Sequence, residues 1–225
     1  MATLLVDADD TLWENITVFH GINARYAQWI APDRDPVVVR RELDQIQVSL
    51  VKTIGYGRNT FRQSLLRGIE HFVGRSPTDD DEAIVRELVR PLQWEELDLI
   101  EGVRETLDAL CSAHQLFLVT KGDHEEQSQK VKRSGLGPFF EAVEILDTKS
   151  VAEYERLIAH HQLDPDLTWM IGNSPRSDIV PALDAGLHAV FIPHEETWGH
   201  ELEDVPDHPR LTQLTRFTEL LTLFA

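Results

Sequence analysis

The 225-residue chain contains one cysteine and two methionines. Cys111 has no partner in the chain, which excludes an internal disulfide bond. It follows Leu107 and Leu110 at helical spacing, a pattern in which cysteine behaves as a small apolar residue. We therefore expect Cys111 to pack in the core.

The sequence also lacks long hydrophobic runs. Its apolar stretches, such as those at residues 4–6 and 116–119, fall far short of the ~18 residues that a membrane-spanning helix needs. Behind Met1 there is neither a basic leader nor a long apolar segment, since Asp7 interrupts the first apolar run. From these features we expect a cytoplasmic protein that has no membrane partner.

Basic residues are scarce relative to acidic ones. The chain has 21 lysines and arginines against 39 aspartates and glutamates, a formal net charge of −18. Such a charge disfavours a nucleic-acid partner, because the phosphate backbone is itself anionic. An anionic substrate would have to bind at a local cluster of cations, to which a metal ion would contribute.

Short apolar runs that end abruptly in polar loops indicate the strands of a sheet. They lie at residues 3–6, 115–119, 143–146, 167–171 and 189–192. Helical patterns separate the later runs. Because strands that alternate with helices form a parallel sheet, the sequence predicts an α/β fold with a doubly wound parallel sheet.

The segment between Thr11 and Thr120 is far longer than one crossover helix requires. It contains four apolar stripes at helical spacing, within residues 16–30, 43–50, 61–72 and 84–89. The residues at 78–82 are an acidic turn typical of a helix start. We therefore predict an α/β core domain of residues 1–14 and 98–225 and an inserted helical domain of residues 15–97.

Polar side chains follow four of the predicted strands. In open parallel sheets, ligands bind beyond the carboxyl ends of the strands, where these loops converge. Clustered carboxylates are hard oxygen ligands that predict Mg²⁺, while a lysine and a threonine hydroxyl suit a phosphate. The residues that we expect to share this site are Asp7, Asp9, Thr120, Lys149, Asn173 and Asp178.

These residues resemble the motifs of a known family. Residues 4–12, Leu-Leu-Val-Asp-Ala-Asp-Asp-Thr-Leu, are similar to the Asp-x-Asp-x-Thr signature of the haloacid dehalogenase-like (HAD) superfamily. The later motifs follow in order: residues 117–120 resemble the second, Lys149 the third, and residues 169–186 with Asn173 and Asp178 the fourth. The resemblance implies a Rossmann-like core, with the helical insert in the position of a substrate-covering cap.

The resemblance also implies a role for each motif residue. Asp7 would be the nucleophile that forms an aspartyl-phosphate, and Asp9 the general acid and base. Mg²⁺ would be the cofactor, and its ligands would be the Asp7 carboxylate, the Asp9 backbone carbonyl, Asp178 and Asn173. The phosphate-binding residues would be Thr120, Lys121 and Lys149.

Two positions depart from the family pattern. Asn173 stands where the family more often has aspartate, and this removes one negative charge from the metal site. Ser150 follows Lys149 where proline is frequent, so Lys130 is the alternative for the third-motif lysine. Outside that role, we expect Lys130 to be an exposed helix charge.

Substrate choice is expected to reside in the helical insert. Residues 55–59 lie between two helical stripes and are a candidate mobile loop, with Tyr56 and Arg58 as candidate substrate contacts. Trp13 directly follows the motif loop and is a third candidate. The competing interpretations are an ordinary interhelical turn and, for Trp13, apolar packing.

The sequence thus predicts a Mg²⁺-dependent phosphatase that acts on a small phosphorylated metabolite, as a monomer or homodimer. Three different functions stay open. The chain could be a catalytically silent binding module, which Asn173 would favour. A 2-haloacid dehalogenase is a second possibility, although dehalogenases of this family lack the acid at the position of Asp9. A phosphomutase is the third.

Overall fold

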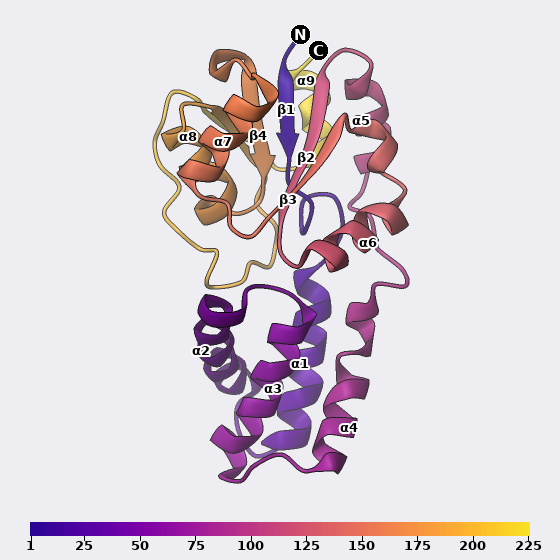
Figure 1. Ribbon diagram of the computed structural model, residues 1–225, viewed down its shortest axis with the longest axis vertical. Coiled ribbons are helices and arrows are strands. Elements are labelled where there is room, and N and C mark those ends of the chain that lie inside the picture. The colour runs from indigo at the N-terminus through magenta and orange to yellow at the C-terminus, as the bar shows by residue number, and fades with distance from the viewer. The chain divides into compact units, whose positions relative to one another are not determined.

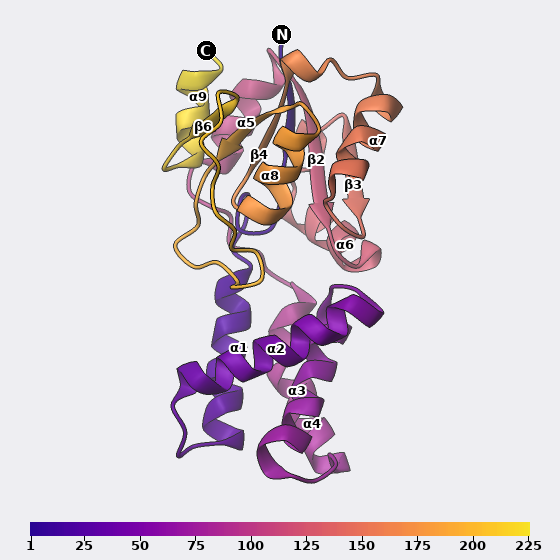
Figure 2. The ribbon, with the colours of Figure 1, turned by 90° about the vertical axis from the view of Figure 1, so that its left-hand side faces the viewer.

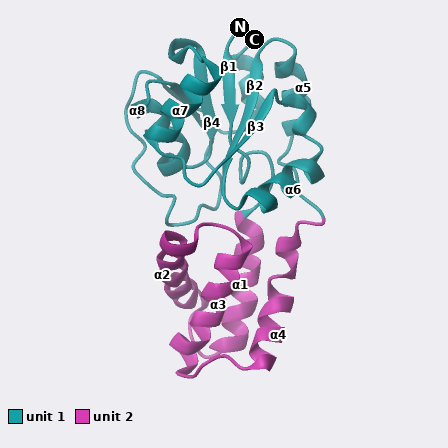
Figure 3. Ribbon diagram, viewed as in Figure 1, with its two compact units in different colours: residues 1–15, 96–225 teal, residues 16–95 magenta.

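The computed structural model describes all 225 residues and divides into two compact units (Figure 3). The first consists of residues 1–15 and 96–225, and the second of residues 16–95. These boundaries lie within two residues of those expected from the sequence. The two units are described separately below.

The first unit contains a six-stranded sheet in which every pair of neighbouring strands is parallel. Its strand order is β3-β2-β1-β4-β5-β6. The strands are β1 (Thr3–Val6), β2 (Gln115–Lys121), β3 (Ala142–Leu146), β4 (Thr168–Gly172), β5 (His188–Phe191) and β6 (Leu211–Gln213). The predicted α/β fold is confirmed, and the edge strand β6 is added to it.

Helices cover both faces of this sheet, because successive residues of each strand point to opposite sides. Leu4 and Val6 pack in a buried cluster with residues of α5, α6 and α9, whereas Leu5 packs in another with residues of α7 and α8 (Figures 1 and 2). The bounds are α5 (Val103–Cys111), α6 (His124–Ser134), α7 (Val151–His161), α8 (Val180–Asp184) and α9 (Leu220–Leu223). Strand β1 is therefore central, and its carboxyl end is fixed from both sides.

Short helical turns complete the first unit. They are the 3-10 helices Gly137–Phe139, Pro165–Leu167 and Phe217–Glu219 and the π-helix Pro175–Ile179. Two residues separate β4 from the π-helix, which leads into α8. Such wide turns are rare and often lie at functional sites.

The second unit is a bundle of helices. It contains α1 (Ile16–Ile30), α2 (Pro36–Ile54), α3 (Arg58–Val73), α4 (Asp79–Leu88) and a 3-10 helix, Arg90–Gln93. Helices α1 and α3 approach closely where the Tyr26 hydroxyl donates to the Leu65 carbonyl oxygen at 2.7 Å. A Cβ atom at Gly68 would lie 2.6 Å from that hydroxyl oxygen, so the contact requires a glycine.

The acidic turn at residues 78–82 begins α4 as the sequence predicts. The Thr78 hydroxyl accepts a hydrogen bond from the Asp81 amide, and the Asp81 carboxylate accepts one from the Thr78 amide. This capping box satisfies two of the amides that a helix start leaves without partners. Arg75 donates to the same carboxylate, and the arginine together with the Thr78 amide holds the pKa of Asp81 well below its usual range.

Two local expectations are wrong. Cys111 is exposed rather than packed in the core, because it is the last residue of α5 and its thiol donates to the Asp108 carbonyl oxygen at 3.2 Å. The expected loop at residues 55–59 is shorter, since α3 already begins at Arg58. The connection contains Gly55 and Gly57, and their positive φ angles of 79° and 118° favour glycine.

No helix in either unit combines the length and the apolar character needed to cross a membrane.

Candidate active site

The candidate site is centred on Asp7, at the carboxyl end of β1. The Asp7 amide donates to the Ile171 carbonyl oxygen of β4 at 2.9 Å, which continues the sheet pairing by one residue. The Asp7 side chain is buried. The Lys149 ammonium donates to one of its oxygens at 2.5 Å, and the Thr11 hydroxyl donates to the other at 2.9 Å.

Lys149 also joins Asp7 to Asp178. Its ammonium lies 2.6 Å from Asp178 Oδ1, and the side chains of Lys149 and Asp178 are each only 1% exposed. The lysine follows β3 and stands directly before Ser150, whose hydroxyl accepts from the Glu153 amide at the start of α7. Ser150 therefore caps a helix where the family frequently has proline. Of the two candidate lysines, Lys149 is the one that reaches Asp7.

Asp178 lies in the π-helix and is held by the turn that follows β4. Its second oxygen, Oδ2, accepts a hydrogen bond from the Ser174 amide at 2.9 Å. A Cβ atom at Gly172 would lie 2.3 Å from this oxygen. Gly172 thus leaves the space that the Asp178 carboxylate needs beside the backbone of β4.

Asp7 and Asp178 share one cation between two buried carboxylates. Burial, together with the charge of Asp178, raises the pKa of Asp7 to about 7, against the opposing effect of Lys149. For Lys149, burial opposes ionisation, but the two carboxylates outweigh it and raise its pKa above the usual range. The group therefore has an excess of negative charge, which favours binding of a further cation.

The donor set suits Mg²⁺. Asp7 and Asp178 offer carboxylate oxygens, and Asn173 offers an amide oxygen that accepts from the Thr11 hydroxyl at 3.4 Å. All three side chains are buried, and hard oxygen ligands are those that Mg²⁺ prefers. The excess negative charge and the oxygen donors fit a divalent cation; the Asp9 backbone carbonyl stays a predicted ligand.

Asp9 lies on the same loop as Asp7, and its carboxylate accepts hydrogen bonds from three side chains. The Lys130 ammonium donates to both oxygens at 2.9 and 3.0 Å, the Gln127 amide donates at 2.9 Å, and the Trp13 indole donates at 2.7 Å. Lys130 also donates to the Asn15 side-chain oxygen at 2.8 Å. Burial opposes ionisation of Asp9, but Lys130 and the other donors prevail and lower its pKa.

Two sequence expectations need correction at this point. Lys130 is not an exposed helix charge, since only 1% of this residue is exposed and its ammonium is paired with the Asp9 carboxylate. Trp13 is a candidate substrate contact by its position in the sequence, but it is fully buried and its indole is directed at Asp9. Both residues therefore hold Asp9 in place.

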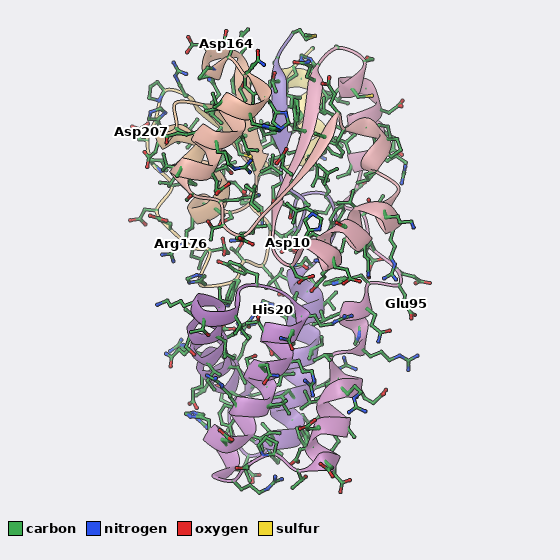
Figure 4. All side chains as sticks on the ribbon, viewed as in Figure 1. Asp10, His20, Glu95, Asp164, Arg176 and Asp207 are labelled. Atoms are coloured by element: carbon green, nitrogen blue, oxygen red, sulfur yellow. The ribbon has the colours of Figure 1, made fainter.

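The loop geometry explains how Asp7 and Asp9 are presented. Asp10 has a φ angle of 61°, a left-handed conformation that aspartate tolerates better than most residues. Its amide donates to the Trp13 carbonyl oxygen and its carboxylate accepts from the Asn15 amide, each at 2.8 Å. Figure 4 shows Asp10 after β1 and Arg176 in the turn after β4. The Asp10 side chain thus shapes the loop.

The predicted phosphate-binding residues lie at different places. Thr120 is buried within β2, one strand away from Asp7. Lys121 ends the same strand, and its ammonium lies 2.6 Å from both the Glu201 carboxylate and the Ser177 hydroxyl. Lys121 is therefore already paired with an anionic group. Tyr56 and Arg58 lie in the helical unit, and their contact with a substrate stays a prediction.

Sequence reasoning does not name Gln127, Glu201 or Ser177, and it names Lys130 only as the alternative third-motif lysine, not as a partner of Asp9. Gln127 and Lys130 stand three residues apart on α6, a spacing that places both side chains on one helix face. That spacing is the one available signal for their shared contact with Asp9. Glu201 comes from the segment between β5 and β6, which has no regular pattern, and Ser177 has only the sequence signature of a turn.

A family model for haloacid dehalogenase-like hydrolases matches residues 1–186. The chain therefore belongs to the haloacid dehalogenase-like hydrolases. This confirms the resemblance that the four motifs indicate, and it establishes the class of the protein as a hydrolase.

Solved structures share the fold. A haloacid dehalogenase-like family hydrolase from Xanthomonas campestris is 26% identical, with a TM-score of 0.86 over 99% of this chain and 90% of that one. The protein YfnB from Bacillus subtilis, named as a HAD-hydrolase, is 24% identical over 199 residues, 84% of this chain and 83% of its own. Its structure, described as bound to magnesium, has a TM-score of 0.71 and covers 99% of this chain and 98% of that one.

More distant structures include two kinds of hydrolase. A predicted phosphoglycolate phosphatase from Haemophilus somnus is 16% identical, with a TM-score of 0.67 over 100% of this chain and 98% of that one. Haloacid dehalogenases share the fold at similar scores. At such identities the likeness shows the fold alone, so the reaction must be argued from the site.

Proposed function

We propose that the protein is a Mg²⁺-dependent phosphatase that hydrolyses a small phosphorylated metabolite through an aspartyl-phosphate on Asp7. The observation that carries this proposal is the second carboxylate, Asp9, on the loop of the first. A phosphate ester needs a proton donor for its leaving alcohol and a base for the attacking water. Asp9 stands two residues from Asp7 and can serve both needs.

In the first step, an oxygen of the Asp7 carboxylate attacks phosphorus. The bond between phosphorus and the ester oxygen breaks, and Asp9 supplies a proton to the leaving alcohol. In the second step, water attacks the phosphorus of the aspartyl-phosphate and Asp9 takes back a proton. Phosphate leaves, and the Asp7 carboxylate is restored.

The contacts of Asp9 support a base role in the second step. Lys130, Gln127 and Trp13 all donate to its carboxylate, an arrangement that favours the ionised form. Ionised Asp9 is the form that exists between the two steps. In this proposal, Lys130 and Gln127 keep the carboxylate on the loop in that form until water arrives.

The other residues position the phosphoryl group. Asp7, the Asp9 carbonyl, Asp178 and Asn173 would hold Mg²⁺, whose positive charge would offset the negative charge of the phosphate. Lys149 lies against both Asp7 and Asp178, where its ammonium can also donate to a phosphoryl oxygen. Thr120 is the proposed hydroxyl donor, and the helical unit is the proposed cap that sets substrate choice.

The same fold also performs dehalogenation, so that reaction is the second candidate. In dehalogenation an aspartate attacks carbon and a halide ion leaves, which requires no proton on the leaving group. Such a reaction would need neither the proton transfer by Asp9 nor the three side chains that donate to it. A silent binding module and a phosphomutase are weaker candidates. Turnover would exclude the silent module, and release of free phosphate would argue against the phosphomutase.

Phosphate release from p-nitrophenyl phosphate and a panel of phosphorylated metabolites tests the proposal. We expect Mg²⁺-dependent release that is lost in Asp7→Asn and strongly reduced in Asp9→Asn. Asp10→Asn, at the adjacent loop position, is the matched control and should retain most activity. Chloride release from 2-chloropropionate without any phosphate release would refute the phosphatase and favour the dehalogenase.

A further inference from the structure

The carboxylate of Glu201 accepts hydrogen bonds from three side chains, those of Lys121, Ser174 and Ser177. One of its oxygens accepts from the Lys121 ammonium at 2.6 Å. The other accepts from the Ser177 hydroxyl at 2.6 Å and the Ser174 hydroxyl at 2.7 Å. The Glu201 and Lys121 side chains are 12% and 18% exposed, so the pair is largely removed from water.

The donors belong to the sheet framework, whereas the acceptor does not. Lys121 ends β2, and Ser174 and Ser177 follow β4, so the donors come from the two strands that flank β1. Glu201 lies on the segment of residues 192–210, which has neither helix nor strand. Arg176 anchors that segment by donating to the His200 carbonyl oxygen at 3.0 Å.

The donor group adjoins the proposed phosphate site. Ser177 directly precedes Asp178, and the Lys121 ammonium lies 2.6 Å from the Ser177 hydroxyl. The Ser174 amide also donates to the Asp178 carboxylate, so the same turn serves both groups. Asp178 in turn shares the Lys149 ammonium with Asp7, so the donor group is joined to the Asp7 site through one carboxylate and one lysine.

We propose that Lys121, Ser174 and Ser177 form a carboxylate-binding subsite that Glu201 fills in this structure and a substrate carboxylate takes over on binding. This inference rests on the proposed phosphatase function and names its substrate class, a small phosphate monoester that carries a carboxylate. The present occupant is itself a carboxylate, so the exchange keeps the same number of charge-assisted hydrogen bonds. It also keeps Lys121 paired.

The proposal assigns Lys121 a role different from the one predicted from the sequence. Its ammonium binds the carboxylate of the substrate, while the phosphate is left to Lys149 and Thr120. The cation matters here because the chain has a formal net charge of −18 and an anionic substrate gains little from the overall field. The opposing view is that Glu201 only fastens the segment of residues 192–210.

Two matched substrates separate these views. 2-Phosphoglycolate and ethyl phosphate have similar size, but only the first carries a carboxylate. Removal of the competing side chain in Glu201→Ala should raise kcat/KM for 2-phosphoglycolate ~10-fold relative to ethyl phosphate, the effect of about one charged hydrogen bond. Glu201→Gln, which keeps the size of the side chain, should move the ratio in the same direction.

Variants at Lys121 and Glu203 complete the design. Lys121→Met should abolish the preference for 2-phosphoglycolate in both the wild-type and Glu201→Ala backgrounds. Glu203→Ala, an exposed glutamate of the same segment, should leave the ratio unchanged. If Glu201→Ala alters both substrates by the same factor, Glu201 only fastens the segment and the proposal is wrong.

A binding measurement keeps this test independent of turnover. Malonate, a dicarboxylate, should raise the melting temperature of Glu201→Ala in the absence of Mg²⁺ more than that of the wild type. The added shift should vanish in the Glu201→Ala/Lys121→Met double variant. If no phosphate ester is hydrolysed but this pattern holds, the proposed function fails and the subsite stands; an equal shift in all variants refutes the subsite.

Discussion

Lys130 offers a sharp test of the contacts that hold Asp9. The Lys130 side chain is 2% exposed and its ammonium donates to both Asp9 oxygens, so Lys130→Met leaves a carboxylate without its cation. Loss of one partner of a fully buried ion pair costs about 3–5 kcal/mol. Because Asp9 is 23% exposed and keeps the Trp13 and Gln127 donors, we expect a loss of about 2–3 kcal/mol.

Urea unfolding of two variants on the same helix measures this loss. Lys132→Met removes an exposed lysine of α6 and should change the free energy of unfolding by less than ~0.5 kcal/mol. In a double-mutant cycle, Lys130→Met should cost much less when Asp9 is already asparagine, because no charge is then left unpaired. Equal effects of Lys130→Met and Lys132→Met, or a cycle without coupling, would refute the reasoning.

Three further predictions concern the metal site and Glu201. Asn173→Asp adds a third carboxylate beside Asp7 and Asp178. Calorimetry should therefore show tighter Mg²⁺ binding and a less stable metal-free protein. An unchanged affinity for Mg²⁺ would argue against Asn173 as a ligand. Gly172→Ala places a Cβ atom 2.3 Å from Asp178 Oδ2 and should weaken Mg²⁺ binding at least ~10-fold, the effect of displacing one ligand. An affinity equal to that of the wild type would show that the turn after β4 rearranges to make room for the Cβ atom. Burial of Glu201 would raise the pKa of its carboxyl group, but the Lys121 ammonium and the two serine hydroxyls outweigh this effect and lower the pKa to about 2. This carboxylate therefore stabilises the fold above about pH 4.5, and the stabilisation is lost as the pH falls toward 2. The stability difference between wild type and Glu201→Gln should therefore shrink by about 3 kcal/mol over that range, and a difference independent of pH would contradict the assignment.

The fold was predictable because its signals are local. Each of the five predicted strands is an apolar run with an abrupt polar end, and the motif residues stand at those ends. Strand β6 was missed because it is a three-residue edge strand, Leu211–Gln213, in which only leucine is apolar. Its pairing with β5 is decided by the sheet already formed and not by its own sequence.

The site was predictable only as far as the motifs extend. Asp7, Lys149 and Asp178 meet as their positions after β1, β3 and β4 require. The partners of Asp9 depend on where α6 packs, and a lysine on a polar helix normally faces water. The contact of Glu201 with Lys121 joins residues 80 positions apart through an irregular segment, and no periodicity encodes it.

Chemical trapping at Asp7 tests the central proposal most directly. The enzyme is quenched in acid during turnover of a phosphate ester and then treated with borohydride, which reduces an aspartyl-phosphate to homoserine. Peptide mass spectrometry should find homoserine at position 7 only when both substrate and Mg²⁺ are present. With p-nitrophenyl phosphate, whose leaving group needs no proton from Asp9, Asp9→Asn should accumulate more of it, because only the second step is then slowed. Turnover that leaves Asp7 unmodified, or that modifies Asp178 instead, would contradict the account.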